Sequence, residues 1–365
     1  MIETQDFDDY VRERVSRDGR LPLAGSLELT WRCNLACVHC YMVDYRREPE
    51  LEAREVRRIL DELADAGCLQ LLITGGEPLL RRDFRDIWRY AKEKGFVLTL
   101  FTNATLVDDE TAAFLRDSPP VVCEVSLYGA SRETYGRACG VPEAFDAAVA
   151  GLDRLRGVLA HVSVKTMAFR ENGDDMEALA VLCEERGVEF HFDTDIFPRL
   201  DLDPAPFRHA FPPEEGVRRV MASELHQRVW GNQAEKWDGA GAKPLKRASK
   251  VVVCRAGESS FLIGPYGDLC LCTLLREPSF SLREGDFMTG WTTTIRDLLE
   301  RERSTPVPCA DCPDLKRCVP CAGRNYLETG TCERAAPVMC RRAHAVSALF
   351  GQAREHQEAP SHAHV

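Results

Sequence analysis

Three cysteines within eight residues are the first side chains in this 365-residue sequence that could do chemistry. Cys33, Cys37 and Cys40 have the spacing Cys-x3-Cys-x2-Cys, so their thiolates must converge on one small object. A structural zinc ion takes four ligands, and His39 could be the fourth, but two adjacent residues rarely both reach one tetrahedral ion. A 4Fe-4S cluster fits better, because three thiolates hold three irons and the fourth iron stays open to a substrate's amine and carboxylate.

A second group of nine cysteines crowds the last quarter of the chain. Its members are Cys254, Cys270, Cys272, Cys309, Cys312, Cys318, Cys321, Cys332 and Cys340. The acidic N-terminus lacks the apolar core of a signal peptide, so we expect a cytoplasmic protein in a reducing compartment. There, metal binding or redox chemistry explains so many cysteines better than disulfides do. The other four stand alone beside apolar residues and are expected in the core: Cys68, Cys123, Cys139 and Cys183.

Composition limits the classes of function. The 47 basic and 58 acidic residues give a net charge of −11, which argues against non-specific nucleic-acid binding, since that needs a basic face. Hydrophobic residues make up 44% and charged residues 29%, as in a globular protein with a sizeable core. No stretch approaches about 18 consecutive apolar residues, so we expect no transmembrane helix and no membrane partner.

Alternating strand and helix patterns must position these cysteines. Strands are expected at 26–30, 69–74, 96–102, 121–127, 161–168 and 188–195. Helices are expected at 52–66, in a segment ending near residue 95, and at 109–117, 142–156 and 174–186. Six strand–helix units predict an α/β fold with a parallel sheet and right-handed crossovers. Six is fewer than the eight units of a closed barrel, so we expect a partial (β/α)6 TIM-like barrel, with a doubly wound sheet as the alternative.

Polar residues recur at alternate positions in the last three expected strands, opposite an apolar face. They are Glu124, Ser126, Ser163, Lys165, His191, Asp193 and Asp195. In a barrel the apolar face packs on helices and the polar face lines a lumen, which suggests a site for a polar substrate. Lys165, Asp193 and Asp195 are therefore candidate catalytic residues, for substrate contact or proton transfer. The simpler alternative is that Glu124 and Lys165 only pair across the sheet.

The remaining segments divide the chain. The expected parts are an N-terminal extension (1–25), the barrel (26–197), a proline-rich linker (198–250), a small cysteine-rich iron–sulfur domain (251–345) and a flexible tail (346–365). The tail carries three histidines, for which a frayed end is a better explanation than a metal site: His356, His362 and His364.

The first cysteine motif, placed directly after the first strand, resembles that of the radical S-adenosylmethionine (SAM) superfamily. Its place suits an active site, because those of barrels lie at the carboxyl ends of the strands. A turn after the second strand, Gly75-Gly76-Glu77-Pro78, resembles the family's turn that holds the methionine amino group of SAM. The chemistry is consistent, since glycines allow close backbone approach and Glu77 can accept from an ammonium.

The resemblance implies further SAM-binding residues. Asn103 lies in Thr-Asn-Ala-Thr at 102–105, similar to a family element that has glycine in place of Ala104. Ser126 stands where relatives contact the ribose or carboxylate, and Arg137 where an arginine reaches the carboxylate. His39 takes the place of an aromatic residue near the adenine. The implied activity is one-electron cleavage of SAM to a 5′-deoxyadenosyl radical, which abstracts hydrogen from the substrate. A flavodoxin or ferredoxin is the implied electron donor.

The C-terminal spacing resembles the SPASM domain, which usually binds two auxiliary 4Fe-4S clusters. The resemblance implies that Cys254, Cys272 and Cys321 hold the first. Cys309, Cys312, Cys318 and Cys340 would hold the second, although two residues separate Cys318 from Cys321 where three are usual. The first set is one thiolate short. Cys270 shares an expected strand face with Cys272 and could supply it, Cys332 is a surplus candidate, and otherwise an open iron could bind substrate. A zinc ribbon is the alternative.

Enzymes with this domain mostly modify peptides, so the resemblance implies a peptide or small protein substrate. Thr273 stands where similar sulfatase-maturing enzymes have an aspartate, which argues against sulfatase maturation as the function. Only about 25 residues precede the first strand, so no N-terminal leader-binding domain is expected. The expected function is a radical SAM/SPASM oxidoreductase that matures a ribosomally made peptide by cross-linking or oxidation. The alternatives are a maturase of a small cofactor or haem precursor and a non-catalytic zinc-binding module.

Overall fold

A computed structural model describes residues 19–42, 49–223, 249–305, 309, 312–315, 318 and 320–358. Six parallel strands form a curved sheet, as predicted. They are β1 (Ala24–Glu28), β2 (Gln70–Thr74), β3 (Val97–Thr102), β4 (Val122–Ser126), β5 (Val162–Met167) and β6 (Glu189–Asp193). Pairing follows the chain order from β1 to β6, so each strand pairs with the next one in the sequence. The described strands leave β6 at one edge of the sheet, so the barrel is partial.

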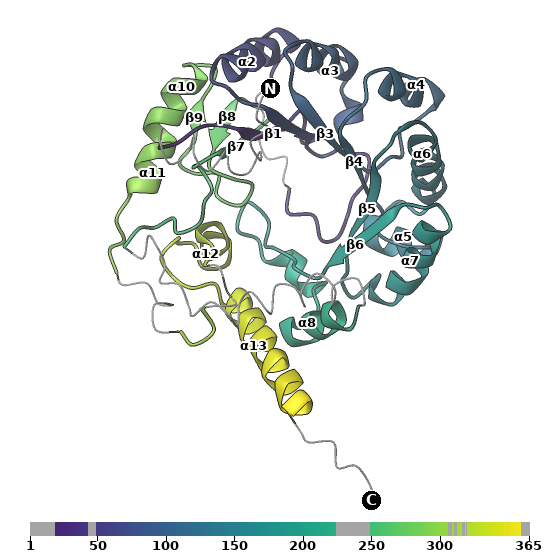
Figure 1. Cartoon of the computed structure of the whole chain (residues 1–365), viewed down its shortest axis with the longest axis vertical. Helices are drawn as coiled ribbons and strands as arrows, with labels where there is room; N and C mark the ends of the chain where they lie inside the picture. The colour runs from purple at the N-terminus through teal and green to yellow at the C-terminus, as the bar shows by residue number, and fades with distance from the viewer. Residues whose placement is uncertain are drawn as a thin grey trace, which may run out of the picture.

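Helices cover the outer face of this sheet (Figure 1). They are α2 (Ala53–Asp65), α3 (Phe84–Glu93), α4 (Asp109–Asp117), α5 (Arg132–Cys139), α6 (Ala144–Val158) and α7 (Met176–Glu184). In α2 the apolar residues at helical spacing, Val56, Ile59, Leu60 and Leu63, are buried against the sheet, and Glu52 and Glu55 form a capping box at its start. Because the helices pack on the outer face of the sheet, the inner face of the strands is left to form the site. In the described part, no helix is long and apolar enough to cross a membrane.

The cysteine-rich region extends the barrel sheet, which the sequence did not predict. Its strands are β7 (Ser260–Ile263), β8 (Asp268–Cys270) and β9 (Phe280–Ser281). β7 pairs parallel to β1, and β8 and β9 continue the same sheet antiparallel. A Cβ on Gly25 would lie 2.3 Å from the Phe261 ring, so the glycine permits β1 and β7 to pair closely there. The C-terminal region is therefore bound to the barrel by backbone hydrogen bonds.

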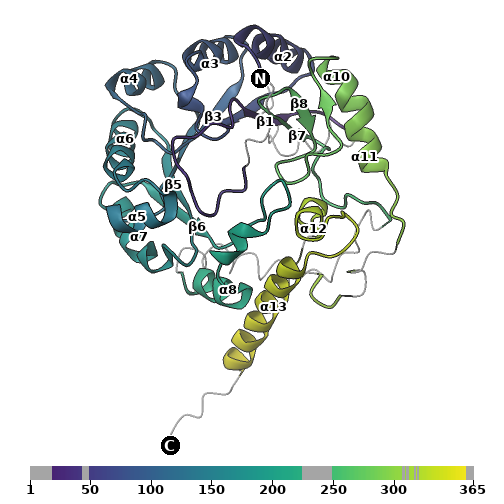
Figure 2. The same ribbon diagram turned by 180° about the vertical axis from the view of Figure 1, so that it is seen from behind.

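The rest of the C-terminal region runs from the outside of β7–β9, beside α2, to the open side of the barrel beside α8 (Pro213–Ala222) (Figure 2). It includes α10 (Phe287–Gly290), α11 (Arg296–Glu300), α12 (Ala322–Thr329) and α13 (Pro337–Glu358). α13 packs against α8, and Arg341 of α13 binds both carboxylate oxygens of Glu214 at 3.0 and 2.7 Å. The predicted linker thus contains a helix that docks on the C-terminal region, and residues 224–248 lie outside the described part.

The expected flexible tail differs from the structure. α13 continues through Glu358, twelve residues past the predicted start of the tail at 346. Alanine, arginine, glutamate and glutamine favour a helix in this stretch, and no proline interrupts it before position 360. His356 belongs to this helix, whereas His362 and His364 lie outside the described residues.

Candidate active site at the carboxyl ends of the strands

The loop with the first three cysteines follows β1 and is bound to the end of α5. Ala36 donates its backbone N–H to the carbonyl of Cys139 at 2.9 Å, and Val38 donates to that of Ala138 at 3.0 Å. Burial raises the pKa of Cys33 to about 11, and the nearby charges of Cys37 and Cys40 add to the increase. The three thiols are thus electrostatic neighbours, as a shared cluster requires.

Cys37 has a neighbour that the sequence did not predict. Its thiol hydrogen-bonds Cys139, which raises the pKa of Cys37 more than burial does. Cys139 is fully buried at the end of α5, as expected of a core cysteine. The cysteine loop therefore rests on the barrel core at its middle member, while Cys33 and Cys40 are exposed.

The Gly-Gly-Glu-Pro turn packs tightly against the backbone of the cysteine loop. Gly76 donates its N–H to the carbonyl of Thr30 at 2.8 Å, and Glu77 donates to that of Arg32 at 2.9 Å. Gly75 has φ +140°, and a Cβ there would lie 2.2 Å from the oxygen of Thr30. A Cβ on Gly76 would lie 2.4 Å from the oxygen of Arg32. Only glycines let this turn lie so close, and Pro78 then begins a short 3₁₀ helix.

The Glu77 carboxylate ties the ends of β2 and β3 together. It accepts hydrogen bonds from the backbone N–H of Leu79 at 3.1 Å, the hydroxyl of Thr102 at 2.9 Å and the N–H of Asn103 at 2.7 Å. Complete burial raises its pKa to about 7, against the lowering effect of these donors. A buried carboxylate of this kind would be stabilised by a cation. Its contact with the ammonium of SAM remains a prediction.

Asn103 links that turn to the cysteine loop. Its side-chain amide donates to the Asn34 side chain at 2.9 Å, and its oxygen accepts from the hydroxyl of Thr105 at 2.6 Å. Asn34 in turn donates to the same hydroxyl at 2.8 Å. Two motifs about 70 residues apart in the sequence thus form one hydrogen-bonded network, with Glu77 on its other side.

His39 lies in an aromatic environment. Its ring centroid is 4.5 Å from those of Tyr128 and Phe169, and the hydroxyl of Tyr128 hydrogen-bonds Ser126. Burial lowers the pKa of His39 to about 3, and His209 lowers it further, so the ring is neutral. Its Nδ1 is buried without a hydrogen-bond partner. An unsatisfied nitrogen among flat rings fits a heteroaromatic base such as adenine. The contact of Ser126 with SAM remains a prediction.

Arg137, the expected carboxylate-binding residue, has other partners. Its guanidinium binds Glu133 one turn earlier in α5 at 2.8 Å, the hydroxyl of Thr134 at 3.1 Å and the carbonyl of Glu171 at 3.3 Å. Half of the side chain is exposed. These partners fix it along α5, so its role toward SAM remains a prediction that would require it to leave them.

Lys165 pairs with Glu124, as the simpler alternative predicted. The ammonium lies 3.4 Å from the carboxylate, and the two residues stand on neighbouring strands with Ser126 opposite Lys165. About half of the Lys165 side chain is exposed, whereas Glu124 is mostly buried. This pairing leaves the lumen of the barrel locally neutral.

The two candidate aspartates are bound by arginines from the C-terminal helices. Arg324 of α12 donates to both carboxylate oxygens of Asp195, at 2.7 and 2.6 Å. Arg342 of α13 binds Asp193 at 2.9 Å and the hydroxyl of Thr194 at 3.0 Å. Sequence reasoning missed both arginines, for which the only signal was the position of Arg324 three residues after a cysteine. The aspartates therefore hold the C-terminal region at the end of β6, and a catalytic role remains a prediction.

A third ion pair joins the other side of the barrel to the C-terminal region. Glu28 of β1 is 3% exposed and accepts two hydrogen bonds from Arg276, at 2.8 and 2.7 Å. It also accepts from the indole N–H of Trp31 at 2.7 Å. A buried bidentate ion pair of this kind fixes the position of the loop after Cys272 relative to β1.

The C-terminal cysteines form two groups. Cys272 has its pKa raised to about 11, mainly by burial and also by the charges of Cys321 and Cys254. These three are the members predicted for the first auxiliary cluster.

The second group has four members. Burial raises the pKa of Cys318 to about 12, and the charges of Cys309, Cys340 and Cys312 add to it. The pKa of Cys340 is likewise raised, first by burial and then by Cys309 and Cys312. The grouping matches the partition that the resemblance implied, and the binding of clusters by these two groups remains a prediction.

Cys270 does not belong to either group. β8 ends at Cys270 and the chain bends immediately afterwards, so Cys270 and Cys272 do not share a strand face. Burial raises the pKa of Cys270, and the charged neighbours that act on it are Arg276, Asp268, Glu28 and Glu277. Its thiol lies 3.6 Å from the carbonyl of Asp268. The expectation that Cys270 supplies the missing thiolate has no support in this geometry.

Among the described residues, no three side chains of histidine, cysteine, aspartate or glutamate are arranged to hold a single metal ion. Ligands of a four-iron cluster bind different irons and need not meet at one point. The three neighbouring thiols, the close glycine turn and the unpartnered His39 nitrogen together fit a cluster with a bound nucleotide.

Comparisons with known proteins agree with this site. The radical SAM superfamily model matches residues 27–183. The chain is 31% identical over 324 residues to the AdoMet-dependent heme synthase of Nitratidesulfovibrio vulgaris, covering 83% of this chain and 88% of that protein. It is 29% identical over 318 residues to the mycofactocin maturase MftC of Mycolicibacterium smegmatis, covering 84% and 79%.

Among solved structures, Streptococcus suis SuiB bound to its precursor peptide SuiA has the same fold, with a TM-score of 0.70 at 16% identity over 91% of this chain and 80% of that one. The cysteine motif, the site geometry and these relatives agree. The chain belongs to the radical SAM superfamily, with a SPASM-type C-terminal region, and is an iron–sulfur enzyme that uses a 4Fe-4S cluster and SAM for radical chemistry.

Proposed function

We propose that this enzyme modifies a peptide by abstracting a hydrogen atom with the 5′-deoxyadenosyl radical. When bound, the cluster supplies one electron to the sulfonium of SAM, and Cys33, Cys37 and Cys40 would hold it. Glu77, Asn103, His39 and Ser126 would bind the nucleotide. The outcome would be a cross-link or an oxidised residue in the peptide.

The charge balance of the lumen carries the choice of a peptide. Four carboxylates at the inner face of the barrel each pair with a basic side chain. The pairs are Glu28–Arg276, Glu124–Lys165, Asp193–Arg342 and Asp195–Arg324. A porphyrin with several carboxylates would have to compete for these cations, whereas a peptide backbone needs only polar groups that donate and accept.

Relatives support both substrate classes. SuiB is solved with a precursor peptide and MftC is named as a maturase, which favours a peptide. The haem synthase relatives favour the second candidate, a haem precursor. Because the relatives divide, the paired lumen charges decide our preference.

We further propose that the C-terminal cysteines bind two auxiliary 4Fe-4S clusters, and that a flavodoxin or ferredoxin is the electron donor. Cys254, Cys272 and Cys321 would hold part of the first. The second would be held by Cys309, Cys312, Cys318 and Cys340. Protein purified without oxygen should then contain about twelve irons per chain; zinc in the C-terminal sites would contradict this part.

The test measures hydrogen transfer. The reconstituted enzyme, dithionite and SAM are incubated with peptides encoded beside the gene or with a haem-precursor porphyrin, and deoxyadenosine is quantified. A peptide should stimulate deoxyadenosine release, and deuterium from a labelled peptide should appear in that product. Stimulation by the porphyrin alone would refute the peptide proposal in favour of the second candidate.

A further inference from the structure

The first auxiliary group contains three thiols, and the loop after α12 brings a fourth to it. Cys254, Cys272 and Cys332 are all partly buried. Cys321 is the N-cap of α12, where its sulfur accepts the backbone N–H of Arg324 at 3.4 Å. The first turn of α12 therefore fixes the position of Cys321 in this group.

A single asparagine folds the loop back along α12. The helix ends at Gly330, whose φ of +75° reverses the chain. Asn325 then donates its side-chain amide to the carbonyl of Cys332 at 3.0 Å and accepts the N–H of Ala336 at 3.0 Å. Since Asn325 lies one turn after Cys321, Cys332 is held beside the start of the same helix.

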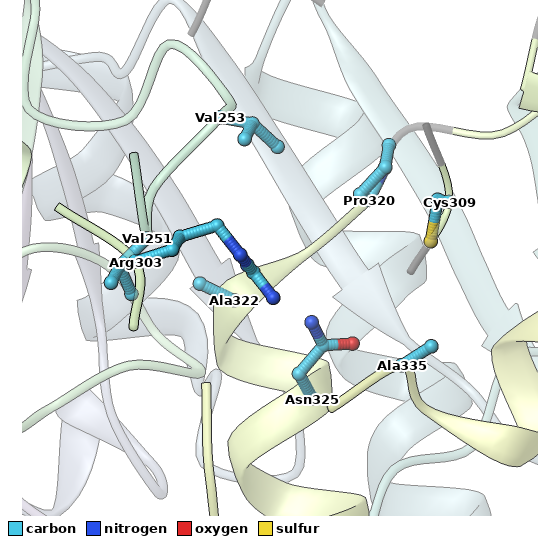
Figure 3. A pocket seen from close by; sticks show the side chains of 8 residues that line it. All are labelled: Val251, Val253, Arg303, Cys309, Pro320, Ala322, Asn325 and Ala335. Carbon is cyan, nitrogen blue, oxygen red and sulfur yellow. The ribbon is translucent and has the colours of Figure 1, made fainter. Parts of the chain in front are cut away.

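The other side of the loop is fixed by the segment before the second cysteine group. Arg303 donates to the carbonyl of Glu333, and Ser304 donates its N–H to the Glu333 carboxylate at 2.9 Å. Figure 3 shows Arg303 and Asn325 pointing toward one another across a cavity that Cys309 also lines. The loop that carries Cys332 is therefore hydrogen-bonded on both sides, through the carbonyl of Cys332 and through Glu333.

The electrostatic surroundings agree. Burial is the main cause that raises the pKa of Cys332, and the charges of Glu333 and then Cys321 add smaller increases. Arg301 and Arg303 lower the same pKa, because guanidinium groups favour a thiolate. Cys270, the alternative, has no cysteine among the charged groups that act on it.

We propose that Cys332 is the fourth thiolate of the first auxiliary cluster, together with Cys254, Cys272 and Cys321. This inference rests on the proposed auxiliary clusters and names a ligand that the family spacing does not supply. A cluster with four protein thiolates has no open iron. It would therefore carry electrons between the C-terminal region and the barrel, and would not bind the substrate.

The test uses the full chain with Cys33, Cys37 and Cys40 replaced by alanine, so that only auxiliary clusters remain. Cys332→Ala in this background should lose up to four of about eight irons, or retain a cluster that oxidises to a three-iron form with its own electron paramagnetic resonance signal. Cyanide should shift the spectrum of this variant and leave the parent unchanged, because only the variant has an open iron. Cys332→Ser, which keeps a ligand atom, should recover most of the iron.

Cys270→Ala is the matched control and should keep eight irons and the parent spectrum. The inference is overturned if Cys332→Ala matches the parent in iron and in its response to cyanide, or if Cys270→Ala changes them instead. A parent that binds zinc or fewer than about eight irons refutes the auxiliary clusters themselves, and thus separates the two failures. Iron and spectra are read without substrate, so the peptide proposal does not affect the result.

Discussion

Replacing Arg324 should weaken the packing of the C-terminal helices on the barrel while leaving SAM cleavage possible. The Arg324 side chain is 5% exposed and bridges Asp195 of the barrel and Glu328 of its own helix. In Arg324→Met, Asp195, which is 25% exposed, regains water. Glu328 is 2% exposed and, within the described part of the chain, keeps the N–H of Val338 as its one remaining donor. Breaking a buried pair costs about 3–5 kcal/mol, and the partial exposure of Asp195 places this case near about 3 kcal/mol.

Hydrogen–deuterium exchange of the anaerobic holoenzyme measures this cost locally. A loss of about 3 kcal/mol corresponds to roughly 150-fold faster exchange of the α12 and α13 amides. Asp195→Asn should have a smaller effect, and Arg324→Met combined with Asp195→Asn should cost less than the sum, because the pair is already broken. Asp193→Asn is the control: Asp193 is half exposed, so its pair with Arg342 should contribute less than about 1 kcal/mol.

Two results would refute this reasoning. Unchanged α12 exchange in Arg324→Met would mean that the ion pair does not hold the helix. Strictly additive effects in the double variant would mean that Arg324 and Asp195 act independently. If Asp193→Asn or Asp195→Asn abolished product while exchange and SAM cleavage stayed normal, the aspartates would be catalytic and not merely positional.

Four further changes test the site. Cys37→Ala should abolish deoxyadenosine formation and remove about a third of the iron; undiminished formation would contradict its ligand role. Gly76→Ala should cost about 1–3 kcal/mol, since its Cβ would lie 2.4 Å from a backbone oxygen, and a normal melting temperature would show that the turn can relax. Burial raises the pKa of Glu77 from 4.5 to about 7, so the folded protein holds this proton more tightly than the unfolded chain. As the pH rises from 4.5 to 7, the free energy of unfolding of the cluster-free protein should therefore fall by about 3 kcal/mol relative to Glu77→Gln. A stability difference in urea melts that stays constant with pH would contradict this prediction. Arg276→Met should cost about 3–5 kcal/mol by leaving Glu28 charged and buried, and adding Glu28→Gln should restore part of it; equal stability of all forms would exclude the pair as a support.

Most of the barrel could be predicted because its signals are local. Apolar spacing marks α2, and period-two alternation marks the strands, within one or two residues of the observed bounds. The helix α5 was missed, since its short, polar sequence has no clear apolar stripe before Tyr135. The cysteine and glycine motifs were visible because their chemistry depends on neighbours in sequence. Their joining by Asn103 was not, since that bond connects loops about 70 residues apart.

The sequence alone determined which residues can hold a cluster and that six strand–helix units carry them, because spacing and periodicity are properties of adjacent positions. The tertiary structure decided the partners of the charges. It paired Asp193 with an arginine of α13 and Asp195 with an arginine of α12, and it joined β7 to β1. It also placed Cys270 among charged side chains with no cysteine among them, whereas Cys321 is one of the charged groups that act on Cys332. These outcomes depend mostly on how segments about 60 to more than 200 residues apart pack, and neither composition nor local pattern encodes the partner of a charge or of a sheet edge.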